Sequence, residues 1–135
     1  MIINAENAIL GRLASYVAKK ALLGEQVMIV NCEKIVLSGS KEFFFARYKQ
    51  RRGRGEPFHG PFFPTTAEGI VKRAIRGMLP WKKDKGRKTF RLIKCFTGMP
   101  KEFVGKEMET IKKDVTSLRG KHVSIGRISK YLKQT

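Results

Sequence analysis

The first thirty residues hold a helix-patterned segment between two short apolar runs, and this arrangement restricts the fold more than any other part of the chain. After Asn7, a plausible N-cap, apolar residues recur at helical spacing up to Ala21, and Gly24 follows as a stop signal. Ile2–Ile3 before the segment and Val27–Val30 after it are short and rich in β-branched residues, as buried strands are. Strand, helix and buried strand in this order predict a βαβ unit and a parallel sheet.

Two more helices are predicted in the next fifty residues. Ser40 is a candidate N-cap for a helix that runs through Tyr48 and ends in the run Arg51–Gly55. Thr65 and Glu68 match a capping box, with Thr65 as the N-cap. The apolar face of this second helix comprises Ile70, Ala74, Ile75 and Leu79, and Pro80 is expected to end it. Before both helices, Ile35–Leu37 predicts a short strand, either a continuation of Val27–Val30 or a partner for it.

Regular patterns are absent from two segments that flank the second helix. Gly53–Pro64 contains three glycines and three prolines and is therefore expected to be a loop. Trp81–Lys88 is predicted as a second, basic loop, followed by a strand over Phe90–Thr97 that Gly98 ends. Met108–Leu118 has weak helical character, and Ile128–Leu132 predicts a short terminal helix. With 135 residues and no internal repeat, we expect one domain over residues 1–135.

Positive charge is concentrated in the middle of the chain. The 29 basic and 11 acidic side chains give a net charge of +18, and residues 41–94 contribute +12 of it. Self-repulsion of this size is tolerable when a polyanion neutralises it. Nucleic acid is the first candidate and an anionic membrane surface the second. No transmembrane helix is expected, because the chain has no apolar run of about eighteen residues. Binding to a membrane surface is ranked low, because the apolar face of Thr65–Leu79 is about what a helix needs to pack on a sheet.

Cations, aromatic rings and glycines alternate in the two basic segments, which we predict to be the binding surface. Lys and Arg neutralise phosphates, Arg adds bidentate contacts, and flat side chains can stack on unpaired bases. Three of the aromatic residues are nevertheless expected mainly to pin their loops onto the domain, namely Phe62, Phe63 and Trp81. His59 is as well suited to a hydrogen bond within its own loop as to a contact with RNA. The predicted RNA-binding residues are Arg47, Lys49, Arg51, Arg52, Arg54, His59, Arg76, Trp81, Lys82, Lys83, Lys85, Arg87 and Lys88.

No catalytic or metal-binding pattern appears in the sequence. The two histidines, His59 and His122, are not spaced as zinc ligands, and neither a nucleophile elbow nor a complete phosphate-binding loop is present. Cys32 and Cys95 form no CxxC pair and are expected to be reduced, small apolar residues in strands. We therefore expect no enzyme activity, cofactor or metal. An RNA-processing enzyme is the weakest alternative, with Glu33 and His59 as its only candidate groups.

Several motifs resemble the L-thirteen family of large-subunit ribosomal proteins. They are Gly11-Arg12-Leu13-Ala14, the block from Ile75 to Pro80, Gly86-Arg87 and the segment from Lys94 to Gly98. The segment from Arg52 to Pro61 is similar to the linker of the archaeal and eukaryotic branch. The resemblance covers nearly the whole chain in the correct order. The resemblance ends near Met108, because the last stretch of the chain is short and its sequence differs from that of longer family members.

The resemblance implies a three-layer α/β/α domain around a mostly parallel sheet of about four strands, with basic loop extensions. It further implies binding to large-subunit rRNA, contacts with neighbouring ribosomal proteins, a role in subunit assembly, and a monomer bound to the ribosome in the cytoplasm. An RNA-binding module that acts outside the ribosome is the main alternative. Within the Ile75–Pro80 block, Gly77 is expected to permit a close helix or backbone approach.

Overall fold

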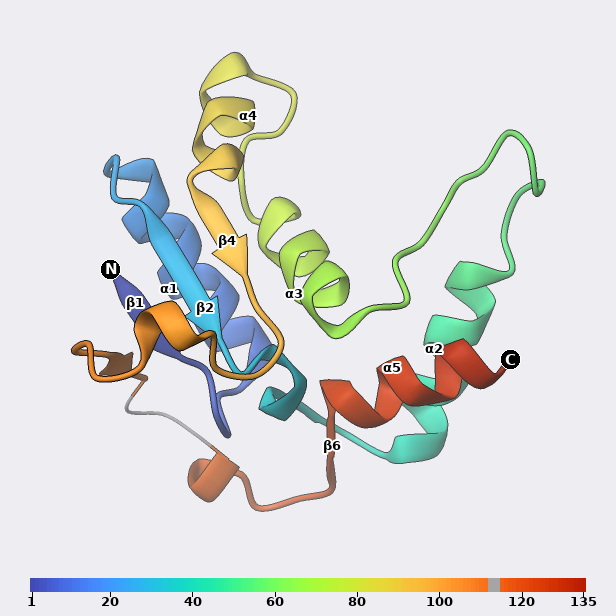
Figure 1. Ribbon diagram of the computed structural model, residues 1–135. Helices are drawn as coiled ribbons and strands as arrows, with labels where there is room; N and C mark the ends of the chain where they lie inside the picture. The colour runs from blue at the N-terminus through green and yellow to red at the C-terminus, as the bar shows by residue number, and fades with distance from the viewer. Residues whose placement is uncertain (112–114) are drawn as a thin grey trace.

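The computed structural model describes residues 1–111 and 115–135, and its centre is a four-stranded parallel sheet (Figure 1). The strands are β1 (Ile2–Asn4), β2 (Val27–Val30), β4 (Ile93–Cys95) and β5 (Glu109–Thr110). Their spatial order is β4-β2-β1-β5, and all three pairings are parallel. The predicted α/β fold, the βαβ unit at the N-terminus and the sheet of about four parallel strands are confirmed.

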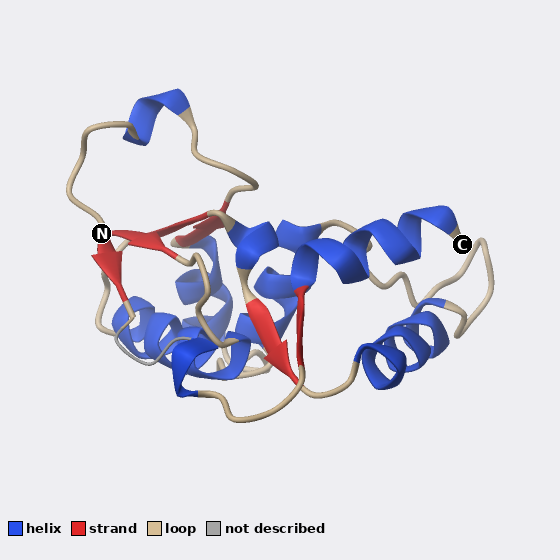
Figure 2. Cartoon of the chain, turned by 90° about the horizontal axis from the view of Figure 1, so that it is seen from below, coloured by secondary structure: helices blue, strands red, loops and turns tan. Residues whose placement is uncertain are grey.

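Helices cover one face of this sheet, and a mostly irregular segment covers the other (Figure 2). The connection from β1 to β2 contains α1 (Leu10–Leu22), and the connection from β2 to β4 contains α3 (Ala67–Arg76). Both crossovers advance in the same direction along the sheet, so their right-handedness places both helices on one face, where they contact each other. The return from β4 to β5 passes the opposite face, where Phe96 packs on Phe103 of the 3-10 helix η2 (Lys101–Phe103).

A second, two-stranded sheet and two helices extend this core. Val36–Ser38 (β3) pairs antiparallel with His122–Ser124 (β6), so the strand predicted near Ile35–Leu37 pairs with the far end of the chain rather than with β2. The helix α5 (Ile125–Gln134) follows β6 directly and packs against both α3 and α2 (Lys41–Arg52). The terminal helix predicted over Ile128–Leu132 is confirmed and is longer than expected.

The buried side chains form one continuous apolar cluster that runs from the sheet to α5. Ile3, Leu13, Ile29, Ile75 and Ile128 in it are fully buried. Burying each such side chain contributes about 1.5–3 kcal/mol to folding. The sheet, α1, α3 and α5 therefore form a rigid platform for the charged segments attached to it.

The start of α1 differs from its prediction because Asn7 lies in a turn before the helix and does not cap it. Asn7 has a left-handed backbone (φ 60°), donates its N–H to the Lys34 carbonyl at 3.2 Å and accepts from the Val115 N–H at 2.8 Å. These bonds hold it in a turn three residues before Leu10, where α1 begins. The prediction of Asn7 as N-cap is therefore wrong, whereas the stop at Gly24 (φ +93°) is confirmed.

Both ends of α3 are also shifted from their predicted positions. Thr66, not Thr65, is the N-cap, and its side chain accepts the Gly69 N–H at 3.3 Å. The Glu68 carboxylate accepts from the Thr97 hydroxyl instead of closing a capping box. The helix ends at Arg76, with Gly77 as its C-cap in a helical conformation (φ −64°, ψ −18°). A side chain at Gly77 would meet only ordinary contacts at 3.5 Å, so the expected close approach at Gly77 is wrong.

The largest error in the predicted secondary structure concerns residues 81–97. The expected loop Trp81–Lys88 contains the first five residues of a helix, α4 (Asp84–Arg91), and the expected strand begins only at Ile93. Gly86 and Thr89 face the protein interior, so the helix lacks the apolar stripe from which helices are recognised. The Thr89 hydroxyl donates to the Lys85 carbonyl at 2.8 Å. Lys85, Arg87 and Lys88 are consequently presented by a helix rather than by a loop.

Toward the C-terminus, the weak helix predicted over Met108–Leu118 is not formed in the part that the structure describes. That part contains β5 and the 3-10 helix η3 (Val115–Ser117), and residues 112–114 lie outside the described residues. Of the two free cysteines, Cys95 lies in a strand as expected, but buried Cys32 lies in the 3-10 helix η1 (Cys32–Lys34). A hydrogen bond with Cys95, together with burial, raises the pKa of the Cys32 thiol.

Candidate nucleic-acid interface

The helix α2 carries the first group of predicted site residues on a well-defined frame. Its N-cap Ser40 accepts the Phe43 N–H at 3.3 Å, and its last turn places Lys49, Arg51 and Arg52 near the negative end of the helix dipole. Tyr48 is the buried residue that anchors the helix. The Ser40 cap is as predicted, and the helix ends at Arg52, within the predicted run Arg51–Gly55.

Two aromatic rings, Tyr48 of α2 and Phe63 of the following loop, hold guanidinium groups from α2 and α3. Phe63 packs edge-on against Tyr48, with ring centroids 5.6 Å apart. The Arg51 guanidinium lies 5.6 Å from the Tyr48 ring and 5.9 Å from the Phe63 ring, and that of Arg73 lies 5.2 Å from the Phe63 ring. Burial raises the pKa of Tyr48, so its hydroxyl stays neutral. The predicted role of Phe63 in pinning its loop is confirmed.

The loop from Gly53 to Pro64 has an ordered tip that exposes two rings. Glu56 and Gly60 exchange two backbone hydrogen bonds of 3.1 and 2.9 Å, and His59 Nδ1 lies 3.0 Å from the Glu56 carboxylate. His59 therefore has a partner within its own loop. The side chains of Phe58 and Phe62 are 91% and 69% exposed. Phe62 does not pin the loop as expected, and both rings are available to a partner.

Arg52 differs from its neighbours because it binds the end of α5. Its guanidinium donates to the Leu132 carbonyl and, at 3.3 Å, to the Thr135 hydroxyl. The Leu132 carbonyl is in the last turn of α5, where helix carbonyls lack partners within the helix. Arg52 thus ties α5 to α2, a role that its position in a run of arginines does not reveal.

Replacing Arg52 with alanine is expected to lower the free energy of unfolding by about 1.5 kcal/mol, because a charge-assisted hydrogen bond to the Leu132 carbonyl is lost. The exposed Arg54 is the matched control, and Arg54→Ala should change the stability by less than about 0.5 kcal/mol. Urea denaturation followed by circular dichroism measures both. Equal stability of the two variants would contradict the structural role of Arg52.

A second set of rings holds cations at the other end of α3. Trp81 packs edge-on against Phe90, with centroids 5.1 Å apart, so the predicted pinning of Trp81 is confirmed. The Arg76 guanidinium lies 4.4 Å from the Trp81 ring, and the Lys72 ammonium lies 5.0 Å from the Phe90 ring. A groove of about 550 Å³ runs along this site, lined among others by Arg73, Arg76, Trp81, Lys82 and Lys83.

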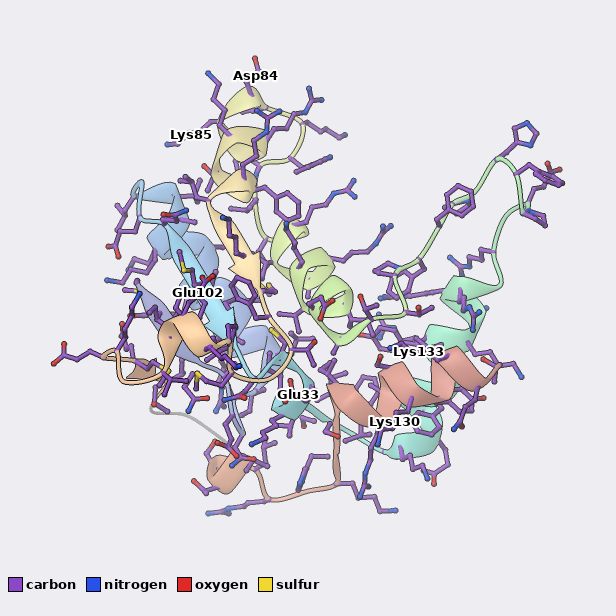
Figure 3. The ribbon with its side chains drawn as sticks, viewed as in Figure 1. Glu33, Asp84, Lys85, Glu102, Lys130 and Lys133 are labelled. Atoms are coloured by element: carbon purple, nitrogen blue, oxygen red, sulfur yellow. The ribbon has the colours of Figure 1, made fainter. Side chains whose placement is uncertain are left out.

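The turn before α4 and α4 itself present a cluster of lysines to solvent. Lys82, Lys83, Lys85 and Lys88 are exposed, and within the described part of the chain none of them forms an ion pair. Arg87 is instead held in place, since it donates to the Trp81 carbonyl at 3.3 Å and lies 3.9 Å from Asp84. Figure 3 shows Asp84 and Lys85 at the tip of this helix.

The structure places the two predicted basic segments at opposite ends of α3 rather than in one cluster. In Figure 1, α4 and the Gly53–Pro64 loop rise as two arms, with α3 between them. A ten-residue helix is about 15 Å long, and its exposed side carries Lys72, Arg73 and Arg76. We call the cations and rings of α2, this loop, α3 and α4 the basic surface. It comprises Arg47, Lys49, Arg51, Arg54, Phe58, Phe62, Lys72, Arg73, Arg76, Trp81, Lys82, Lys83, Lys85, Arg87 and Lys88.

Lys72 and Arg73 belong to this surface but are absent from the predicted site. The signal for them is present in the sequence, since they lie opposite the apolar face of α3, on the same side as Arg76. Their contacts with Phe90 and Phe63 join the two basic segments, and these contacts depend on how α3 packs beside rings from elsewhere in the chain.

The groups considered for catalysis have structural partners instead. The Glu33 carboxylate accepts the Gly98 N–H at 2.9 Å and so holds the turn after β4, and His59 is paired with Glu56. In residues 1–111 and 115–135, no three His, Cys, Asp or Glu side chains are grouped so that they could hold a metal ion. Over the same residues, every helix is too short or too polar to cross a membrane.

Comparison with known proteins identifies the family. The profile described as Ribosomal protein L13 matches residues 1–102. A large ribosomal subunit protein uL13 from Archaeoglobus fulgidus is 43% identical over 134 residues, covering 97% of this chain and 86% of the relative. The uL13 of Methanococcus maripaludis is 41% identical (98% and 96% covered), and that of Methanocaldococcus jannaschii is 40% identical (97% and 96%). The chain therefore belongs to the ribosomal protein L13 family, and its similarity to archaeal members agrees with the branch that the Arg52–Pro61 motif indicated.

Proposed function

We propose that this protein is a structural constituent of the large ribosomal subunit and binds folded large-subunit rRNA through the basic surface. The observation that carries the proposal is the row of cations along α2, α3 and α4, in which Arg51, Arg73 and Arg76 are held against rings. The relatives named above are large-subunit proteins, which agrees with this role. Its action is to bind and support an RNA fold rather than to catalyse a reaction.

Affinity in this proposal arises mostly from phosphate neutralisation. Each phosphate contact releases counterions, so the logarithm of the binding constant falls by about 0.7–0.9 per decade of salt for every contact. Guanidinium groups already fixed on aromatic rings lose less conformational entropy when they bind. Specificity follows from the shape of the folded RNA, since the cations are fixed at separate places along two arms and the helix between them.

The protein acts as a single unit bound to the ribosome. Residues 1–135 act as one unit, because the core cluster links the sheet to α5 without interruption. The protein is a monomer within the ribosome, in the cytoplasm, where it joins the rRNA during subunit assembly and contacts neighbouring ribosomal proteins.

Binding to transcribed large-subunit rRNA as a function of salt tests the proposal. The expected slope of log K against log salt is about −4 or steeper, corresponding to five or more phosphate contacts. Small-subunit rRNA of similar length is the control competitor and should displace the protein poorly. Equal displacement by both RNAs would favour the alternative of an RNA-binding module without ribosomal specificity.

Phe58 is expected to stack on an unpaired RNA base, because its ring is almost fully exposed at the tip of a basic loop. Phe58→Ala should weaken rRNA binding by about 1–3 kcal/mol, the usual value of one base–aromatic stack, and leave the unfolding temperature unchanged. Phe63→Ala is the matched control, since it removes a ring that packs on Tyr48 and should therefore lower stability. Filter binding and thermal denaturation measure the two effects. Wild-type affinity of the Phe58 variant would show that the ring makes no RNA contact.

A further inference from the structure

A groove at the N-terminal end of α3 contains a second set of cations. It has a volume of about 540 Å³ and lies where the chain leaves β2 and β4, between the first turns of α3 and the length of α5. Arg127, Lys130 and Lys133 contribute exposed cations from one side of α5. Figure 3 shows Glu33 beside the first turn of α5, and Lys130 and Lys133 along that helix.

The acidic residues in this groove leave its cations without ionic partners. Glu33 accepts the Gly98 N–H at 2.9 Å and Glu68 accepts the Thr97 hydroxyl, so both carboxylates hold the turn after β4. In the described part of the chain, no ion pair joins either carboxylate to Arg127, Lys130 or Lys133. The N-termini of α3 and α5 also line the groove and add to the positive potential.

The mixture of groups distinguishes among anionic ligands. Glu33 and Glu68 repel any polyanion, so an anionic ligand that fits must also place hydrogen-bond donors beside their carboxylates, which the carboxylate side chains of an acidic peptide do not do. A ribose–phosphate chain brings phosphates for the cations and 2′-hydroxyl groups that can donate to carboxylate oxygens. From this complementarity we propose that the groove along α5 is a second RNA site, which binds the phosphate backbone of an RNA strand through Arg127, Lys130 and Lys133.

This inference rests on the proposed function and deepens it. The basic surface and the α5 groove share none of their cations. A protein with both sites contacts RNA along α5 as well as along α2, α3 and α4, and it therefore binds more of a folded RNA than the basic surface alone. The groove is absent from the predicted site because its residues come from four separate parts of the sequence.

The test compares two double variants that remove the same charge. Lys130→Ala with Lys133→Ala should weaken binding to large-subunit rRNA about tenfold at 0.1 M salt and reduce the salt slope by about 1.4–1.8. The control, Lys101→Ala with Lys106→Ala, removes two exposed lysines from η2 and the turn after it. These lysines lie on the face of the sheet opposite α1 and α3, and the control should bind within about twofold of wild type. Circular dichroism checks that both variants are folded.

Acylation of lysines by an amine-reactive ester, read by mass spectrometry, provides an independent measurement. Bound rRNA should protect Lys130 and Lys133 but not Lys101. Equal protection by inorganic phosphate alone would contradict the assignment to an RNA strand. If the α5 variant binds like the control while removal of lysines from α4 weakens binding, this inference is wrong and the proposed function stands. If neither site affects rRNA binding, both fail.

Discussion

Gly86→Ala is expected to destabilise the protein by about 3 kcal/mol or more, although alanine favours helices over glycine by about 1 kcal/mol. The reason is the close approach of α4 to the turn that precedes it. A Cβ atom at Gly86 would lie 2.1 Å from the Pro80 carbonyl oxygen and 2.5 Å from the Pro80 carbonyl carbon. These are backbone atoms in a turn closed by the Lys83 N–H, which donates to the Pro80 carbonyl at 3.0 Å, so they cannot move without opening it.

The matched control for this prediction is Gly77→Ala, nine residues earlier. Gly77 has helical dihedral angles, and an added Cβ would meet nothing closer than 3.5 Å. The control variant should have the stability of the wild type or gain up to about 1 kcal/mol from the smaller entropy of its unfolded chain. Thermal denaturation separates the two, with a decrease in Tm of roughly 10 °C or more expected for Gly86→Ala only. Equal Tm values would show that α4 does not pack on Pro80 as described.

Removing the lysines of the α4 arm should cause the largest loss of RNA affinity. Replacing Lys82, Lys83, Lys85 and Lys88 with glutamine keeps polar, helix-compatible side chains at exposed positions and removes four charges. The salt slope should fall by about 3, since each phosphate contact contributes about 0.7–0.9. Affinity for large-subunit rRNA at 0.1 M salt should fall roughly a hundredfold or more. Stability should be unchanged or slightly increased, because repulsion within the cluster is relieved.

A control variant removes the same charge from elsewhere on the protein. Lys19, Lys94, Lys101 and Lys106 are also exposed and lie outside both the basic surface and the α5 groove. Replacing these four with glutamine should change rRNA affinity several-fold at most, through the lower net charge alone. Similar losses for both quadruple variants would mean that binding depends on net charge and not on the arm that α4 forms.

Local patterns were sufficient to predict the parts of the fold that depend on local chemistry. Continuous β-branched composition identified β2, and Ser40 identified the start of α2. The two main failures have different causes. Asn7 is held in a turn by the distant residues Lys34 and Val115, whereas the buried side of α4 consists of Gly86 and Thr89 instead of large apolar side chains. Neither arrangement leaves a periodic signal in the sequence.

The candidate site could likewise be predicted from the sequence only in part. Charge density alone indicated both basic segments, because sixteen basic side chains against four acidic ones over residues 41–94 is a property of composition. The role of an individual cation depends on three-dimensional neighbours. Arg52 binds a carbonyl eighty residues away, while Arg51 beside it lies over two rings. The cations along α5 became a candidate site only when the fold placed them beside the ends of β2 and β4.

Sedimentation of the tagged protein from a cell lysate through a sucrose gradient, at moderate and then at high salt, tests the central claim most directly. The protein should sediment with the large ribosomal subunit at moderate salt and stay with it after the high-salt wash. Many phosphate contacts then act together with the fit between the protein surface and the folded RNA. Recovery of the protein at the top of the gradient at both salt concentrations would contradict the account.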